Sequence, residues 1–267
     1  MIPVRPLGRI GLETSALGFG VSGPLGSPLT GEGQVRALIE QAHAGGVRLF
    51  DTAPFYGDAE PRLGRALRGV PRGEIVVVSK AGTRFEAGRA IKDFTPAGVR
   101  ASLERSLQSL RLDRLDVLLL HGPPSAVGPE LLDTLRALLA QGLVRAVGVC
   151  GRGEELRLAV SDPVFSVIQA PVHSPWPGWA QAQGLGFLGI EALFGLRRGF
   201  GLGAGDAWRL LRRLRPAAPA AEPAGEADAE ALLRRALETD GVSAVVTTTT
   251  QPRRLAENLR IAARLCP

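Results

Sequence analysis

The feature that most constrains the fold is an eightfold alternation of short apolar runs with longer amphipathic segments. The runs are almost continuously apolar, which is typical of parallel strands buried on both faces of a sheet. They span residues 16–20, 47–51, 74–80, 115–121, 144–150, 165–171, 184–192 and 242–249. Eight strand-helix units in 267 residues favour a closed (β/α)8 barrel, an α/β fold, because an open doubly wound sheet of this length usually has fewer strands.

Two segments fall outside this alternation. Residues 5–16, RPLGRIGLETSA, predict a short β-hairpin with a glycine turn that closes the bottom of the barrel. Residues 216–228, PAAPAAEPAGEAD, are rich in Ala, Pro and Gly and predict a flexible surface loop. Because a single βα unit follows that loop, we expect one domain over residues 1–267.

Composition and charge argue against several classes of protein. The net charge is +6, but the basic residues are scattered among acids and alanines without interleaved aromatics, so we expect no nucleic-acid partner. No apolar run approaches the ~20 residues of a membrane span, and the N-terminus lacks the apolar core of a signal peptide, so we expect a cytoplasmic protein. The two cysteines, Cys150 and Cys266, lie far apart and predict neither a disulfide framework nor a metal site.

A glycine motif follows the first apolar run. GFGVSG, residues 18–23, fits the G-x-G-x-x-G fingerprint of dinucleotide-binding sheets. That fingerprint requires a helix to open within the glycine run, so that its N-terminal amides face a pyrophosphate. Here PLGSPLTG follows, with two prolines and no helical periodicity. The sequence therefore favours a flexible loop over the mouth of the barrel.

Lysine and tyrosine are unusually rare in this chain. Of 32 basic residues only two are lysines, Lys80 and Lys92, and Tyr56 is the one tyrosine. Arginine replaces lysine wherever a positive charge alone is enough, so a retained lysine suggests that its particular chemistry is needed.

Ionisable residues stand at the ends of three consecutive predicted strands. Asp51 ends the second, Lys80 the third and His121 the fourth, and Tyr56 follows Asp51 by five residues. The C-terminal ends of barrel strands meet at one face, where the active sites of such folds are built. We therefore expect these four side chains to converge in the barrel mouth.

The motifs around these residues resemble those of the aldo-keto reductase family. The similarity runs over nearly the whole chain, from LGRIGLETSALGFG through GVRLFDTAPFYGDAEPRLGRAL, VVVSKAG, LERSLQSLRLDRLDVLLLHGPP and GLVRAVGV to TTTTQPRRLAENL. The resemblance implies that Asp51, Tyr56, Lys80 and His121 are a catalytic tetrad. It also implies a monomer that reduces an aldehyde or ketone to an alcohol by hydride transfer.

Elementary chemistry is consistent with such a tetrad. A free tyrosine has a pKa of about 10 and donates its proton reluctantly at neutral pH. A cation ~4 Å away contributes on the order of 4 kcal/mol at an effective dielectric of ~20, equivalent to about three pKa units. We therefore expect Lys80 to bring the pKa of Tyr56 near neutrality. Asp51 would hold Lys80, and His121 would orient and polarise the carbonyl.

The resemblance also implies a nicotinamide cofactor. Gln169 matches the family glutamine that meets the nicotinamide carboxamide, and Thr249, Arg254 and Asn258 match contacts to the adenine and its 2′-phosphate. The planar charged donors of Arg254 suit a phosphate, which favours NADPH over NADH. Gly20 and Cys150 complete the expected cofactor site. No metal is expected.

One departure from the family pattern keeps other functions open. Cys150 and Gly151 stand where the family usually has Ser-Asn, whose amide also holds the carboxamide. One alternative is a redox-silent member that senses the cofactor or acts as a scaffold. The other is a non-redox lyase or isomerase that uses Tyr56 and Lys80 for acid-base chemistry.

Overall fold

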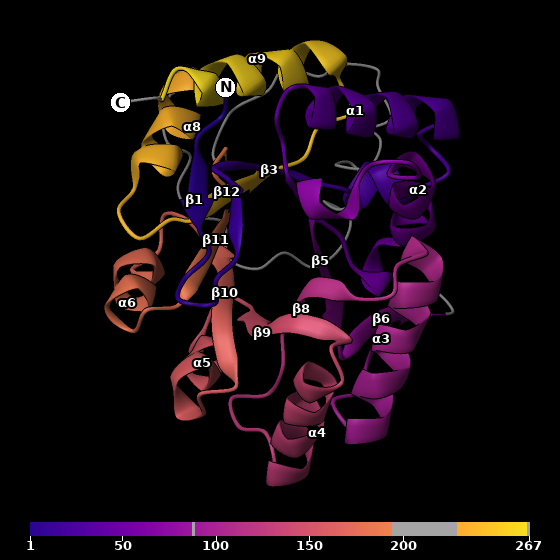
Figure 1. Cartoon of the computed structure of the whole chain (residues 1–267), viewed down its shortest axis with the longest axis vertical. Coiled ribbons are helices and arrows are strands. Elements are labelled where there is room, and N and C mark those ends of the chain that lie inside the picture. Colours follow the sequence, from indigo (N-terminus) through magenta and orange to yellow (C-terminus); the bar gives the residue numbers. More distant parts are fainter. Residues whose placement is uncertain (87–88, 194–228, 266–267) are drawn as a thin grey trace.

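The centre of the computed structural model is a closed barrel of eight parallel strands (Figure 1). The structure describes residues 1–86, 89–193 and 229–265. In the order of their pairing the strands are β3 (Leu17–Gly20), β4 (Leu49–Asp51), β5 (Val76–Ala81), β8 (Leu115–His121), β9 (Val144–Cys150), β10 (Phe165–Pro171), β11 (Gly186–Ile190) and β12 (Ala244–Thr247), which pairs with β3. Every strand falls on a predicted run, so the predicted barrel is confirmed.

Helices surround the barrel (Figure 1). Those of the described residues are α1 (Glu32–Ala44), α2 (Ala59–Ala66), α3 (Pro96–Leu110), α4 (Pro129–Ala140), α5 (Leu158–Ser161), α6 (Trp176–Ala182), α8 (Ala229–Glu238) and α9 (Pro252–Ala263). In α1 the buried residues Val35, Leu38, Ile39 and Ala42 follow helical spacing. At α3 the Thr95 hydroxyl accepts a hydrogen bond from the Gly98 amide at 3.1 Å. Amphipathic spacing and local capping thus define this outer layer.

A short antiparallel hairpin, β1 (Val4–Pro6) and β2 (Glu13–Ser15), precedes the barrel as the sequence predicts. Its turn inserts Leu7 and Leu12 into the cluster of side chains that fills the barrel interior. The turn needs a glycine at Gly8, because a Cβ there would lie 2.4 Å from the amide nitrogen of Gly186 at the start of β11. The hairpin therefore closes the end of the barrel where the strands begin.

A second hairpin, β6 (Thr83–Glu86) and β7 (Arg89–Lys92), follows β5 directly and was not predicted. The Thr83 hydroxyl donates a hydrogen bond of 2.6 Å to the carbonyl oxygen of His121 at the end of β8. This contact places the base of the hairpin beside the barrel mouth.

The loop after β3 has the form that the sequence favours. It contains a single turn of 3₁₀-helix, Gly23–Gly26, and α1 begins only at Glu32. No helix opens within the glycine run, so the GFGVSG motif does not build a dinucleotide-binding helix N-terminus.

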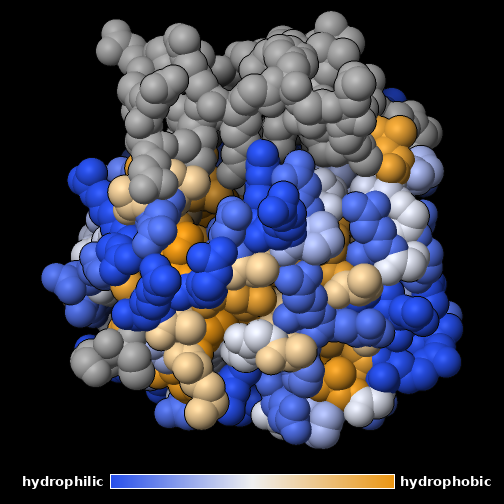
Figure 2. All heavy atoms as spheres, turned by 90° about the horizontal axis from the view of Figure 1, so that it is seen from above, coloured by the Kyte–Doolittle hydropathy of each residue, from blue (hydrophilic) through white to orange (hydrophobic). Residues whose placement is uncertain are grey.

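The outer surface is mainly hydrophilic on the face that Figure 2 shows, with hydrophobic side chains scattered between polar ones. In the described part of the chain the large exposed hydrophobic residues are Met1, Val4, Leu29 and Phe85. No helix in these ranges is both long and apolar enough to cross a membrane. The predicted loop at 216–228 and Cys266 lie outside the described residues.

Candidate active site

Strand alternation brings three of the four expected catalytic residues into the barrel. Leu49, Val78 and Leu119 belong to the interior cluster. Successive side chains of a strand point to opposite faces, so the residue two positions after an interior residue also points inward. Asp51 follows Leu49 by two, Lys80 follows Val78, and His121 follows Leu119. All three stand at the end of their strands, which places them at the mouth.

Lys80 and Asp51 form a buried ion pair. The Lys80 Nζ donates to Asp51 Oδ1 at 2.7 Å and to the carbonyl oxygen of Thr52 at 2.9 Å. Lys80 is 0% exposed and Asp51 5%. Burial, the largest single effect, lowers the pKa of Lys80, but the charge of Asp51, its hydrogen bond and the neighbouring Tyr56 and Cys150 together raise the pKa above its usual value. Lys80 is therefore a permanent cation held by Asp51, as the sequence predicts.

Tyr56 lies against this pair. It ends a 3₁₀ turn, Pro54–Tyr56, that follows β4 after two residues. The Lys80 Nζ is 5.3 Å from the centroid of the Tyr56 ring. The Tyr56 and His121 rings meet edge to face with centroids 5.9 Å apart. The structure thus brings together all four residues of the expected tetrad.

The sequence predicts that Lys80 lowers the pKa of Tyr56 towards neutrality. In the structure of the protein alone, that prediction is wrong in direction. Burial raises the pKa of Tyr56 above 10, and the negative charge of Asp51 adds to that rise. The charge of Lys80 acts in the opposite sense but does not outweigh burial. The sequence argument counted the cation and underestimated desolvation of the phenolate. Tyr56 is therefore a protonated phenol at neutral pH.

His121 is neutral at physiological pH. Burial, followed by the positive charges of Lys80, Lys92 and Arg152, lowers the pKa of His121 to about 3. Its Nδ1 is buried and has no hydrogen-bond partner in the structure. A neutral imidazole can orient a polar ligand through a hydrogen bond at its other ring nitrogen, Nε2.

Gln169 is fixed by a hydrogen-bond chain that the sequence did not predict. Its Nε2 donates to Asp51 Oδ1 at 2.9 Å, and its Oε1 accepts from the Cys150 thiol at 3.1 Å. Burial raises the pKa of Cys150 to about 11, so the thiol keeps its proton. Of the two residues that were assigned to the nicotinamide, Gln169 thus holds Asp51 directly and Cys150 holds Gln169. The amide of Gln169 keeps one N–H and one lone pair for a further partner.

Arg62 is a buried residue that sequence reasoning missed. Its Nη1 donates to the carbonyl oxygens of Leu25, Ser27 and Thr30 at 2.8, 3.1 and 2.9 Å. These bonds hold the loop after β3 against the backbone of Tyr56, where a Cβ on Gly26 would lie 1.6 Å from the Tyr56 carbonyl oxygen. Arg62 therefore supports the position of Tyr56 indirectly.

The remaining expected cofactor residues gather around β12 and the start of α9. Gly20 ends β3, and its carbonyl oxygen accepts from the Thr248 hydroxyl at 2.9 Å. The Thr249 hydroxyl accepts from the Gln251 amide at 3.1 Å, and the Asn258 amide donates to the Thr247 hydroxyl at 3.4 Å. Asn258 thus faces β12.

Arg254 has an unused charge in the first turn of α9. It makes no hydrogen bond or ion pair with any residue that the structure describes. A guanidinium without a partner, next to the N-terminus of a helix, has the chemistry that binds phosphate. Together with the remaining N–H of Gln169, this arrangement fits a phosphate-bearing nicotinamide dinucleotide.

Two aromatic rings outside the tetrad complete one wall of the mouth. The Phe55 ring meets the His121 and Phe85 rings edge to face, at 5.8 Å in both cases. Phe55 adjoins Tyr56 in sequence, whereas Phe85 comes from the β6–β7 hairpin. Sequence analysis could not anticipate this contact, because it depends on a hairpin that was not predicted.

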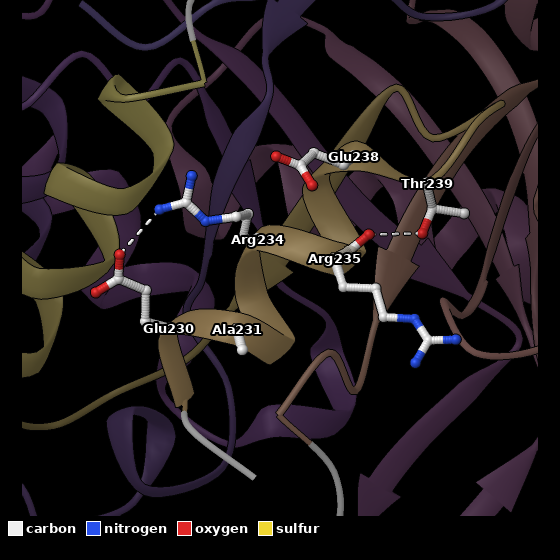
Figure 3. A pocket seen from close by; sticks show the side chains of 6 residues that line it. All are labelled: Glu230, Ala231, Arg234, Arg235, Glu238 and Thr239. Carbon is white, nitrogen blue, oxygen red and sulfur yellow. Dashed lines mark hydrogen bonds and ion pairs between the residues drawn. The ribbon is translucent and has the colours of Figure 1, made fainter.

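The structure also contains hollows that do not coincide with these residues. One of about 540 Å³ lies along α8 and is lined by six residues from Glu230 to Thr239 (Figure 3). There Arg234 donates to Glu230 at 2.9 Å, and the Thr239 hydroxyl donates to the Arg235 carbonyl at 2.8 Å. These groups satisfy one another locally, and none of the lining side chains is a buried polar group without a partner, of the kind found at the barrel mouth. In the described ranges, no three His, Cys, Asp or Glu side chains could hold a metal ion together.

The architecture and the four residues at its mouth agree with the comparison to family models. Residues 16–176 match the model of the aldo/keto reductase family. The chain belongs to the aldo/keto reductase family. The homologues in this family are oxidoreductases.

Individual relatives support the same assignment. The chain is 36% identical over 173 residues to L-galactose dehydrogenase of Arabidopsis thaliana, a match that covers 61% of this chain and 53% of that protein. It is 31% identical to the NADH-specific methylglyoxal reductase of Escherichia coli strain K12, over 62% of this chain and 57% of that protein. The chain thus spans little more than half the length of these two relatives.

A solved structure extends the likeness to the full chain. A Pseudomonas aeruginosa protein described as an aldo-keto reductase superposes with a TM-score of 0.75 and 30% identity, over 98% of this chain and 94% of that one.

Proposed function

We propose that this protein reduces an aldehyde or ketone to an alcohol with NADPH, using Tyr56 as the general acid. The observation that carries the proposal is the buried Lys80–Asp51 pair beneath the Tyr56 ring, with His121 alongside. A cation beside a partly buried phenol is suited to stabilising a substrate oxygen that gains negative charge. Reduction of a carbonyl creates such an oxygen, and the bound reduced nicotinamide supplies the hydride.

Tyr56 is the proton donor in this scheme. Its raised pKa keeps the phenolic proton in place over the physiological range. As negative charge develops on the substrate oxygen, Tyr56 gives up its proton and Lys80 stabilises the phenolate that results. Asp51 keeps Lys80 charged and in position, and Gln169 with Cys150 keeps Asp51 in position.

His121 orients the carbonyl rather than protonating it. An imidazole whose pKa is about 3 is neutral at neutral pH, so it lacks the second, acidic proton of an imidazolium. The ring of His121 packs on Tyr56, and one ring nitrogen can donate a hydrogen bond to the carbonyl oxygen. That bond directs the oxygen towards the Tyr56 hydroxyl.

The cofactor preference rests on Arg254. Its guanidinium supplies two or more parallel donors for a phosphate, and NADPH carries a 2′-phosphate that NADH lacks. Thr249 and Asn258 flank this position, and Gly20 lies where β3 meets β12. One relative is named NADH-specific, so the preference is a property to be measured on this chain. We further propose a single-domain, cytoplasmic monomer.

Two measurements on the purified protein test this proposal. A fluorescence titration with NADPH and with NADH should give tighter binding of NADPH, and Arg254→Gln should remove the difference. Oxidation of NADPH should then be followed with a panel of aldehydes and ketones. Failure to bind either nucleotide would contradict the proposal and favour the non-redox lyase or isomerase. Nucleotide binding without turnover of any carbonyl would contradict it in favour of the redox-silent alternative.

Product formation from a substrate without added nicotinamide would instead support lyase or isomerase chemistry. The same assay separates these outcomes, because it is run with and without the nucleotide.

A further inference from the structure

We propose that the carbonyl substrate carries a carboxylate or similar anionic group, which binds Lys92 and Arg152 at the rim of the mouth. This inference rests on the proposed reductase function and names the class of substrate for it. Its support comes from the two cations, from the solvent-exposed ion pair that Arg152 makes, and from the aromatic rings beside Lys92.

Lys92 is a cation with no carboxylate within ion-pair distance in the described part of the chain, although its charge lowers the pKa of Glu155. It ends β7, and its Nζ donates at 2.8 Å to the carbonyl oxygen of Gly122, the residue after His121. Lys92 makes no ion pair with any residue that the structure describes, and its side chain is exposed. An ammonium has three N–H donors, so two remain for a ligand beside His121. Lys92 is also the second of the two lysines in a chain that otherwise uses arginine.

Arg152 supplies the second cation from β9. It follows Cys150 by two residues, and its backbone N–H donates to Glu155 Oε1 at 2.7 Å. Its guanidinium pairs with Glu191, which lies directly after β11. The Arg152 side chain is 64% exposed and that of Glu191 is 30% exposed. A pair so close to water can exchange its carboxylate for that of a ligand at small cost.

The field of both cations reaches the reaction centre. Lys92 and Arg152 each contribute to the lowered pKa of His121. The acids nearby are already engaged, since Glu155 accepts from the backbone N–H groups of Arg152 and Gly153. A ligand with a negative charge would therefore gain favourable electrostatic energy on binding at this rim, because the cations there are incompletely neutralised.

The surfaces beside Lys92 are aromatic. Phe85 lies on the strand that pairs with β7, is 43% exposed, and its ring meets Phe55. A substrate with an apolar or aromatic body could rest on Phe55 and Phe85, extend its anionic group to Lys92 and Arg152, and present its carbonyl to Tyr56. This geometry selects carbonyl compounds with an acid group at some distance from the reacting carbon.

The experiment compares two substrates of almost equal shape, 4-formylbenzoate and 4-formylbenzamide. Both carry an aromatic aldehyde, but only the first is charged. With NADPH and the full chain, we expect kcat/KM to be at least about tenfold higher for the carboxylate, since a hydrogen bond to a charged group typically contributes that much.

Variants assign the selectivity to these residues. Lys92→Gln keeps a donor for the carbonyl oxygen of Gly122 but removes the charge. Arg152→Gln likewise removes the charge of the second cation while keeping a polar side chain. Each should reduce the carboxylate-to-amide ratio about threefold, as expected of an exposed charge contact, whereas Lys92→Arg should retain most of it. Arg89→Gln removes a charge from the start of the same strand, where no partner is present in the described chain, and should leave the ratio unchanged.

Glu191→Gln offers a prediction of opposite sign. It removes the competing carboxylate while keeping an acceptor for Arg152, so the KM for 4-formylbenzoate should fall. Equal turnover of both aldehydes, or a ratio that Lys92→Gln leaves intact, would overturn the anionic substrate class and leave the reductase function standing. Turnover of neither aldehyde nor any other carbonyl would overturn both.

Discussion

The barrel mouth contains two ion pairs of similar chemistry at different depths. Lys80 and Asp51 meet at its floor, where both side chains are nearly inaccessible to water. Arg152 and Glu191 meet at its rim, where both are in contact with solvent. The floor pair is held by further hydrogen bonds from Gln169 and to Thr52, whereas the described residues give the side chains of the rim pair no such support.

Depth decides what each pair can do. Removing one partner from a buried pair leaves a charge without compensation, which costs several kcal/mol, so the floor pair is a permanent part of the fold. An exposed pair contributes about 0–1 kcal/mol and is screened by salt. The floor is therefore suited to holding a fixed charge for chemistry, and the rim to exchanging partners with a ligand.

The largest effect is expected from Asp51→Asn. The substitution preserves shape but leaves Lys80 buried without its counter-charge, so we expect the free energy of unfolding to fall by about 3–5 kcal/mol. Turnover should also be lost, because the pKa of Lys80 falls with its partner gone. Denaturant unfolding and steady-state assays measure the two effects. A stability loss below about 1 kcal/mol would show that the pair is not desolvated as described.

An intermediate effect is expected from pH. The pKa of His121 is lowered to about 3 in the folded protein, against about 6.5 when unfolded. Between these values the unfolded chain binds the extra proton, so the stability that this group contributes is complete above pH 6.5 and is lost as pH falls towards 3. The slope should approach about 1 kcal/mol per pH unit within that window.

Unfolding measured from pH 7 to pH 4 on the native protein and on His121→Gln tests this sign. The variant should show a shallower loss of stability on acidification. Parallel slopes would contradict a neutral, desolvated His121.

The smallest effect is expected at the rim. Arg152→Gln should change the free energy of unfolding by less than about 1 kcal/mol, and the change should shrink further at high salt. The same denaturant titration, at low and high ionic strength, compares it with Asp51→Asn. A loss as large as that of the floor variant would remove the distinction between the two pairs.

The sequence was sufficient for the barrel and for the prediction that the four residues gather at its mouth, because local pattern determines both. Continuous apolar runs identify all eight strands, and strand ends place Asp51, Lys80 and His121 at one face. The direction of the Tyr56 pKa shift required the structure, because desolvation depends on what covers the ring.

Long-range contacts were equally hidden from the sequence. The bonds of Gln169 to Asp51 and Cys150 join three separate strands, and the pair of Arg152 with Glu191 joins two loops. Nothing in the spacing of these residues indicates that they meet. The β6–β7 hairpin was missed for a similar reason, since its few residues carry no strong strand pattern, yet the rarity of lysine had already singled out Lys92.

The most direct test of the central claim is turnover by Tyr56→Phe. The variant keeps the ring that packs on His121 and Lys80 but lacks the proton donor. With NADPH and a good carbonyl substrate, we predict kcat to fall about 10²- to 10⁴-fold while nucleotide binding is retained. A variant that reduces the same substrate as fast as the native protein would contradict Tyr56 as the general acid.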